Sequence, residues 1–172
     1  MAIIRPTYMV NSTFNLKPEK LKLMGITHIL SDLDNTLIPW NSPEASEELK
    51  QWQAELKKYH IELIVVSNNS YDRIHEAVVD MDVKIIARAK KPLPFAIRSF
   101  VNMSSVSKER VLFVGDQLLT DVIAGNLSGV RTVMVKPLVD TDLKKTRFNR
   151  FFERPILKLI NRIYKQTWKD SI

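Results

Sequence analysis

Two carboxylates stand two residues apart in the run Ser31-Asp32-Leu33-Asp34-Asn35-Thr36, directly after an apolar segment. If that segment is a buried strand, Asp32 and Asp34 can face one crevice while Leu33 packs behind them. One carboxylate can then attack or bind a metal while the other serves as acid and base, provided that their surroundings separate their pKa values. The same run also suits a simple turn with a side-chain cap, so the pair alone does not decide the chemistry.

Three more polar motifs follow later apolar segments. Val66-Ser67-Asn68-Asn69-Ser70 offers a hydroxyl, an amide and backbone N–H groups, which suit a phosphate. Ala89-Lys90-Lys91-Pro92 presents a lysine, and Gly115-Asp116-Gln117-Leu118-Leu119-Thr120-Asp121 offers two acids as oxygen ligands for Mg²⁺ or as its supports. Each motif by itself also fits a loop, a solvated surface lysine or a helix cap.

The segments that must position these motifs alternate between short apolar runs and helical patterns. Runs dense in Ile, Val, Leu and Phe predict buried parallel strands at 26–31, 61–67, 83–87, 111–115 and 131–135. Helices are expected between them, at 43–59, 72–80, 94–103 and 120–128. Ser42 would cap the first helix and Gly129 would end the last. The alternation predicts an α/β fold, a doubly wound parallel sheet with helices on both faces and ligands beyond the carboxyl ends of its strands.

Length and composition bound the class of protein. The chain has 172 residues, the usual size of one domain, and its 45% hydrophobic and 26% charged residues are ordinary for a globular protein. Because it contains no cysteine, disulfides, thiolate metal sites and a cysteine nucleophile are excluded. No apolar run approaches the roughly 20 residues that span a bilayer, so a cytoplasmic protein is expected.

The net charge of +7 is concentrated at the carboxyl end. Residues 136–172 contain ten Lys or Arg and four Asp or Glu, whereas residues 1–135 contain sixteen basic and fifteen acidic residues. We therefore predict a single domain over 1–145 and a basic tail over 146–172, built of one or two amphipathic helices, with Pro155 opening the second. The tail could pack on the body or lie on an anionic membrane, and nucleic acid is the least favoured partner.

The motifs occur in one order on consecutive strands: Asp-x-Asp-x-Thr, Ser, Lys-Pro, then Gly-Asp-x-x-x-x-Asp. Over residues 25–136 this order resembles the haloacid dehalogenase-like superfamily. The stretches 32–40 and 115–121 further resemble its small bacterial subfamily related to mitochondrial phosphatidylglycerophosphate phosphatases. The superfamily commonly inserts a cap domain after the first or second motif, but the spacing here leaves no room for one. The site should therefore be open to bulky substrates.

The resemblance implies a Mg²⁺-dependent phosphatase that works through an aspartyl-phosphate. Asp32 would be the nucleophile, and Asp34 the acid and then the base. Ser67, Lys91 and backbone groups near Asn68 would hold the transferring phosphate.

Some assignments within the resemblance stay open or are indirect. Lys90 is the other candidate for the phosphate-binding lysine. Mg²⁺ would be held by the Asp32 carboxylate, the Asp34 backbone carbonyl and Asp116, with Asp121 steadying the site from behind.

The leading expectation for the substrate is phosphatidylglycerophosphate at the cytoplasmic face of a membrane, with the tail as a peripheral contact. The same chemistry would also serve a phosphoprotein, a nucleic-acid end or a soluble phosphometabolite. A non-enzymatic phospho-acceptor signalling domain carries similar groups at its strand ends. In such a domain the lysine would follow the last strand, whereas here it precedes Gly115-Asp116, so the order argues against that alternative.

Overall fold

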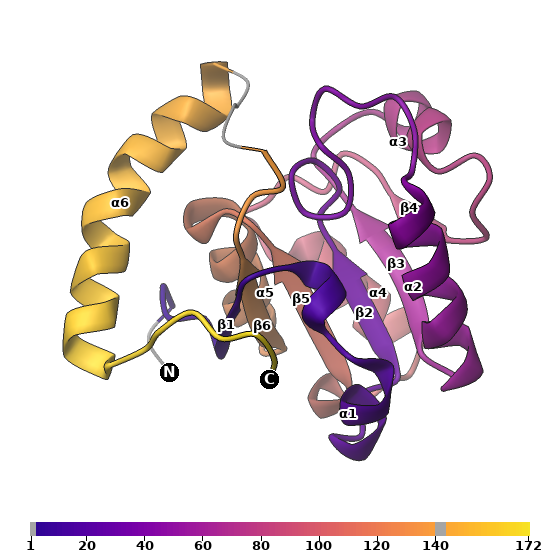
Figure 1. The fold of residues 1–172 in the computed structure, drawn as a ribbon, viewed down its shortest axis with the longest axis horizontal. Helices are drawn as coiled ribbons and strands as arrows, with labels where there is room; N and C mark the ends of the chain where they lie inside the picture. The colour runs from indigo at the N-terminus through magenta and orange to yellow at the C-terminus, as the bar shows by residue number, and fades with distance from the viewer. Residues whose placement is uncertain (1–2, 140–143) are drawn as a thin grey trace.

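Six parallel strands form one sheet in the order β1-β6-β5-β2-β3-β4 in the computed structural model, which describes residues 3–139 and 144–172 (Figure 1). The strands are β1 (Tyr8–Val10), β2 (His28–Ser31), β3 (Glu62–Val66), β4 (Lys84–Ile86), β5 (Val111–Gly115) and β6 (Arg131–Val135). The predicted α/β sheet is thus confirmed, and the five predicted strands all occur. The short strand β1 was not predicted, because three residues carry no periodic pattern.

Helices cover both faces of the sheet. They are α1 (Pro18–Leu23), α2 (Glu47–Lys58), α3 (Tyr71–Ala77), α4 (Phe95–Met103), α5 (Ile123–Ser128) and α6 (Lys144–Tyr164). Shorter turns lie at η1 (Thr13–Asn15), η2 (Lys108–Arg110) and η3 (Leu118–Val122), of which η3 is a π-helical turn. The chain thus crosses from strand to strand through helical segments, as the α/β pattern requires.

The structure corrects two predicted helix features and confirms a third. The expected start at residue 43 with a Ser42 cap is wrong: α2 begins at Glu47, because the Ser46 hydroxyl accepts a hydrogen bond of 3.2 Å from the Leu49 N–H. The predicted helix at 120–128 is divided between η3 and α5. Gly129 ends α5 in the left-handed conformation, with φ of 78°, as predicted.

Alternate side chains of the strands enter two separate cores. Ile29, Leu63 and Leu112 belong to the core that also contains residues of α1, α2 and α3. Their neighbours Leu30, Ile64 and Phe113 belong to the core beneath α4 and α5. Because both faces of the central strands are buried, these strands consist almost entirely of apolar residues.

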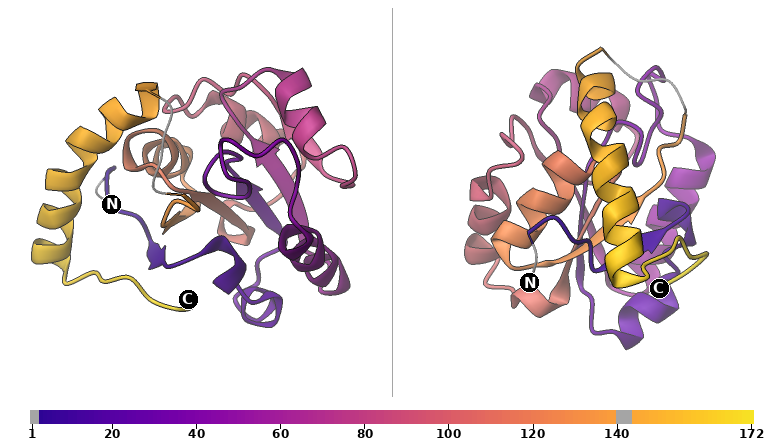
Figure 2. Two further views of the ribbon diagram at one scale, coloured as in Figure 1. Left: turned by 45° about the horizontal axis from the view of Figure 1, so that its top comes forward. Right: turned by 90° about the vertical axis from the view of Figure 1, so that its left-hand side faces the viewer.

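The carboxyl-terminal segment packs on the body at the β1 end of the sheet (Figure 2). The expectation that Pro155 opens a second helix is wrong, since α6 is one helix with Pro155 inside it. Ile160 of α6 is buried against Met9, Leu118, Val122 and Met134. Beyond α6, the Lys169 N–H donates to the Met9 carbonyl of β1 (3.0 Å), and the Lys169 carbonyl accepts from the N–H of Asn11, directly after β1 (2.9 Å). None of the helices in residues 3–139 and 144–172 is long and apolar enough to cross a membrane.

The close packing of α5 on the sheet yields a testable prediction. A Cβ at Gly125 would lie 2.4 Å from Thr132 Cγ2 and 3.3 Å from Phe113 Cβ, so Gly125→Ala should lower the free energy of unfolding by about 1–3 kcal/mol. Gly25→Ala is the control: no atom lies within 4 Å, and only the strain of a φ of 75° is added, at a cost of about 1 kcal/mol. Urea unfolding measures both values. A smaller loss for Gly125→Ala than for Gly25→Ala would contradict the packing.

Candidate active site

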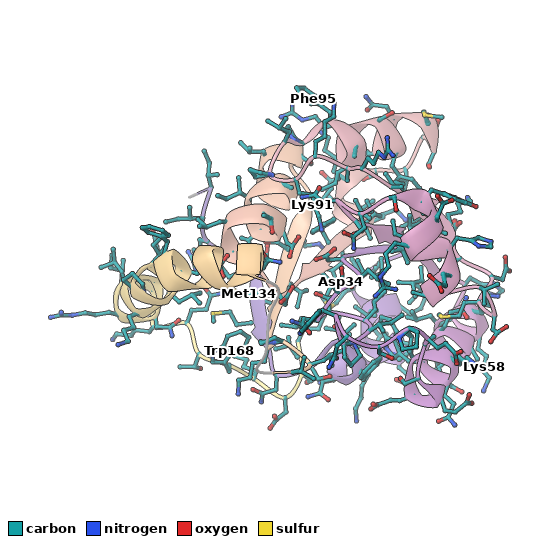
Figure 3. All side chains as sticks on the ribbon, turned by 90° about the horizontal axis from the view of Figure 1, so that it is seen from above. Asp34, Lys58, Lys91, Phe95, Met134 and Trp168 are labelled. Atoms are coloured by element: carbon teal, nitrogen blue, oxygen red, sulfur yellow. The ribbon has the colours of Figure 1, made fainter. Side chains whose placement is uncertain are left out.

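Polar side chains from successive strand ends meet at the carboxyl edge of the sheet, which Figure 3 shows from above. The ammonium group of Lys91 lies 2.8 Å from Asp32 Oδ1 and 2.8 Å from Asp121 Oδ1, and the side chain of Lys91 is only 3% exposed. Lys90 is exposed. Of the two lysines that the sequence left open, it is therefore Lys91 that lies among the carboxylates.

The carboxylates of Asp32, Asp116 and Asp121 form one buried cluster, in which oxygen atoms of all three lie within 4.8 Å of one another. The Thr36 hydroxyl donates a 3.2 Å hydrogen bond to Asp116. Three buried carboxylates exceed the single positive charge of Lys91, and uncompensated buried charge is costly. The donor set, all oxygen and anionic, fits a hard divalent cation such as Mg²⁺. The sequence had placed Asp121 behind the ligands, whereas its carboxylate lies in the cluster itself.

Burial and the neighbouring charges act in opposite directions on the pKa values of the ion pair. Burial, opposed by Lys91 and assisted by Asp32, raises the pKa of Asp121 to about 6. Burial by itself would lower the pKa of Lys91, but the carboxylates of Asp121 and Asp32 raise that pKa above its ordinary value. Lys91 therefore keeps its positive charge at neutral pH in spite of its burial.

Asp34 lies outside the acidic cluster and has different surroundings. Its carboxylate accepts a 2.6 Å hydrogen bond from Asn69 Nδ2 and lies 3.5 Å from Arg73 Nη2. Burial, reinforced by the charge of Asp32, raises the pKa of Asp34 in spite of Asn69, Arg73 and Lys91. A carboxyl group that holds its proton more firmly than usual suits a proton donor.

The loop after β3 is tied to the loop that carries Lys91. The Lys91 N–H donates to Asn68 Oδ1 at 2.7 Å, and Asn68 Nδ2 donates to the Lys91 carbonyl at 3.0 Å. Ser67 is buried at the end of β3, and its hydroxyl accepts a 3.2 Å hydrogen bond from the Asn69 N–H. The side chain of Asn68 therefore positions the backbone of Lys91. The phosphate-binding role predicted for the backbone groups near Asn68 stays a prediction.

Gly115 makes room for Asp121 at the end of β5. A Cβ at residue 115 would lie 2.3 Å from the Cβ of Asp121 and 2.4 Å from its Oδ2. That Oδ2 accepts a 3.0 Å hydrogen bond from the Gln117 N–H, which folds the side chain back over the strand end. The π-helical turn η3 thus brings Asp121 beside Asp116 only because residue 115 has no side chain.

The sequence motifs missed two residues that hold the site in place. Arg73 of α3 contacts Asp34 and also donates to the carbonyls of Trp40 (3.5 Å) and Ser42 (3.3 Å), which joins α3 to the loop after β2. Glu153 of α6 is buried and accepts a 2.8 Å hydrogen bond from the Leu119 N–H in η3. Arg73 gave no signal in the sequence. Glu153 did, since it is the only acidic residue between residues 144 and 164.

Comparisons with known proteins agree with this arrangement. A family model described as HAD-hydrolase-like matches residues 88–146. A Bacillus subtilis (strain 168) protein named "Probable phosphatase YqeG" is 38% identical over 165 residues, which is 96% of each chain.

Two solved structures share the fold. One is an uncharacterized Listeria monocytogenes protein, with 15% identity and a TM-score of 0.52 over 80% of this chain and 100% of that one. The other is the cobalt-bound deoxy-D-mannose-octulosonate 8-phosphate phosphatase of Haemophilus influenzae, with 14% identity and a TM-score of 0.54 over 66% of this chain and 70% of that one.

Fold, acidic strand-end site and relatives together define an enzyme of the phosphatase class. The chain belongs to the haloacid dehalogenase-like hydrolases, as the sequence resemblance predicted. The narrower relation to phosphatidylglycerophosphate phosphatases stays a prediction.

A methyl group at residue 115 tests whether Asp121 must lie where it does. Gly115→Ala is expected to lower kcat about 100-fold or more, because the added Cβ would displace the carboxylate that holds Lys91. Phosphate release from p-nitrophenyl phosphate measures the effect, and circular dichroism checks that the variant is folded. Gly25→Ala, remote from the site, should leave kcat unchanged. An unaltered kcat in folded Gly115→Ala would show that Asp121 is not needed in this position.

Proposed function

We propose that this phosphatase hydrolyses phosphatidylglycerophosphate to phosphatidylglycerol, with Mg²⁺ as cofactor and Asp32 as nucleophile. The chemistry is supported above all by one observation: Lys91 is buried between Asp32 and Asp121, with a second acid, Asp34, held nearby in different surroundings. Two carboxylates with separate environments and one fixed ammonium group match what phosphoryl transfer to a carboxylate requires.

The reaction divides into two displacements at phosphorus. An oxygen of Asp32 attacks the phosphorus atom, the bond to the ester oxygen breaks, and protonated Asp34 gives its proton to that leaving oxygen. Asp34, now ionised, takes a proton from a water molecule that attacks the aspartyl-phosphate, which releases inorganic phosphate and restores Asp32. Lys91, Ser67 and the backbone N–H groups near Asn68 stabilise the charge on the transferring oxygens.

Mg²⁺ would be held by the carboxylates of Asp32 and Asp116 and by the Asp34 backbone carbonyl, with Asp121 beside them. When bound, the cation offsets the negative charge of the cluster and of the phosphate, so that two anions can approach each other. Thr36 orients Asp116 for this task through its hydrogen bond.

The open site favours a bulky substrate. Between Asp34 and α2 lies a single loop, and only α3 and β4 separate Ser67 from Lys91, so the described part of the chain places no cap domain over the carboxyl edge. A phosphate at a membrane surface can reach such an edge. The same chemistry on a phosphoprotein, a nucleic-acid end or a soluble phosphometabolite is the alternative that the experiments must separate.

The outer face of α6 supports a peripheral position on the inner face of the membrane. Phe152, Leu159 and Ile163 are 47%, 54% and 59% exposed, and the exposed basic residues Lys158 and Arg162 lie on the same helix. An anionic bilayer attracts such a combination of apolar and basic residues. Because Ile160 and Glu153 of the same helix pack on the body, deleting residues after Lys145 would damage the fold, so surface substitutions are the better probe of this contact.

Substitution of the two acids tests the mechanism. Asp32→Asn should abolish phosphate release and leave no phosphorylated protein, because an amide cannot accept the phosphoryl group. Asp34→Asn should lower kcat about 10²–10⁴-fold, the usual contribution of a general acid. Both are measured on phosphatidylglycerophosphate in detergent micelles and on p-nitrophenyl phosphate. If Asp32-dependent release occurs only from the soluble ester, the chemistry stands and the lipid substrate is wrong.

Metal binding can be tested without turnover. Mg²⁺ at about 100 times its dissociation constant should stabilise the protein by about 2.7 kcal/mol, which raises Tm by roughly 5–10 °C for a chain of this size. Asp116→Asn should remove this rise and, in the presence of a chelator, melt no lower than the unaltered protein, because one repelling charge is gone. Differential scanning calorimetry measures both. An equal Mg²⁺ response in Asp116→Asn would exclude Asp116 as a ligand.

A further inference from the structure

The segment that carries Lys91 also exposes basic and apolar side chains around it. Leu93 is 47% exposed and Phe95 is 66% exposed, although both are large and apolar. Arg88 and Lys90, on the other side of Lys91, are exposed as well. We call these four residues, Arg88, Lys90, Leu93 and Phe95, the rim surface.

The stretch of sequence that contains the rim surface carries only basic charged residues. Residues 83–108, which lie between Asp82 and Glu109, contain six Lys or Arg and no Asp or Glu. Lys91 is one of the six and is buried in the site, and the others are exposed. This charge favours an anionic partner.

The rim surface lies at the same edge of the sheet as the catalytic cluster. Two hydrogen bonds join the backbone of Lys91 to Asn68 and so tie this segment to the loop after β3. In the view from above, Lys91 and Asp34 lie near the middle of this face and Phe95 lies at its margin (Figure 3). A partner in contact with Phe95 would thus lie at the margin of the face on which the site opens.

We propose that the rim surface docks the enzyme on an anionic lipid bilayer and so turns its active site toward the headgroups. Leu93 and Phe95 enter the boundary between headgroups and acyl chains, while Arg88 and Lys90 pair with lipid phosphates. The rim surface follows β4, at the opposite end of the sheet from β1, where α6 packs. The exposed face of α6 therefore lies at the other end of the sheet, whereas the rim surface belongs to the segment that carries Lys91. This inference rests on the proposed lipid substrate.

Two pairs of substitutions test the docking. Leu93→Ser with Phe95→Ser should weaken binding to phosphatidylglycerol-containing vesicles at least tenfold and lower turnover of phosphatidylglycerophosphate in those vesicles to the same degree. Arg88→Gln with Lys90→Gln should weaken vesicle binding about 30-fold and reduce its dependence on salt, since each removed charge contributes roughly a factor of five. Both pairs should hydrolyse p-nitrophenyl phosphate at the rate of the unaltered enzyme, which also shows that they are folded.

The control pair is Val79→Ser with Met103→Ser, which changes two apolar residues that are 60% and 83% exposed but lie outside the rim surface. It should leave vesicle binding and turnover unchanged. The proposal is overturned if the rim variants bind vesicles like the unaltered protein, or if the control pair loses as much binding as the rim variants do. It is also overturned if the rim variants keep vesicle binding and lipid turnover and lose only the hydrolysis of a phosphopeptide. Failure of the lipid function itself looks different: release from phosphatidylglycerophosphate is then absent even in detergent micelles, where docking is not needed.

Discussion

The ammonium group of Lys91, shared between Asp32 and Asp121, is the interaction on which the site depends. Three buried carboxylates would repel one another strongly in a poorly hydrated setting, and Lys91 is the buried cation that faces two of them at 2.8 Å. The contact joins the ends of β2 and β5 to the segment after β4. Burial would lower the pKa of Lys91, but the carboxylates of Asp121 and Asp32 raise it. The two carboxylates thus maintain the positive charge on Lys91 that holds them together.

The geometry around Lys91 is kept by backbone constraints as much as by charge. Gly115 leaves the space that the Asp121 side chain fills, and the π-helical turn η3 brings Asp121 back toward the strand end. Glu153 then fixes η3 from outside by accepting the Leu119 N–H. Helix α6 is therefore part of the support of the active site, whichever surface its outer face contacts. This contact explains why the basic helix α6 carries the buried acid Glu153.

The sequence predicted what depends on local pattern and on motif order. Dense apolar runs identified β2 to β6, and the order of acid, serine, lysine and acid brought Asp32, Ser67, Lys91 and Asp116 to one edge. The errors arose where two local signals competed or where the partner is distant. Ser42 and Ser46 both suit an N-cap, and only the bond to Leu49 decides between them. Pro155 can open a helix or lie within one. The contacts of Arg73 and Glu153 link residues more than 30 positions apart, so no window of sequence reveals them.

An uncapped edge raises a physical question that the cluster itself does not answer. Phosphoryl transfer gains from a site with little water, because charges then interact more strongly, and many enzymes close a domain or lid over the substrate for this purpose. Here Asp34 is only partly shielded, with 22% of its side chain exposed in an ion pair with Arg73. An anionic bilayer in contact with Leu93 and Phe95 would limit the access of water to this edge. On this proposal the membrane takes the place of the cap, so that docking beside the substrate and exclusion of water come from the same contact.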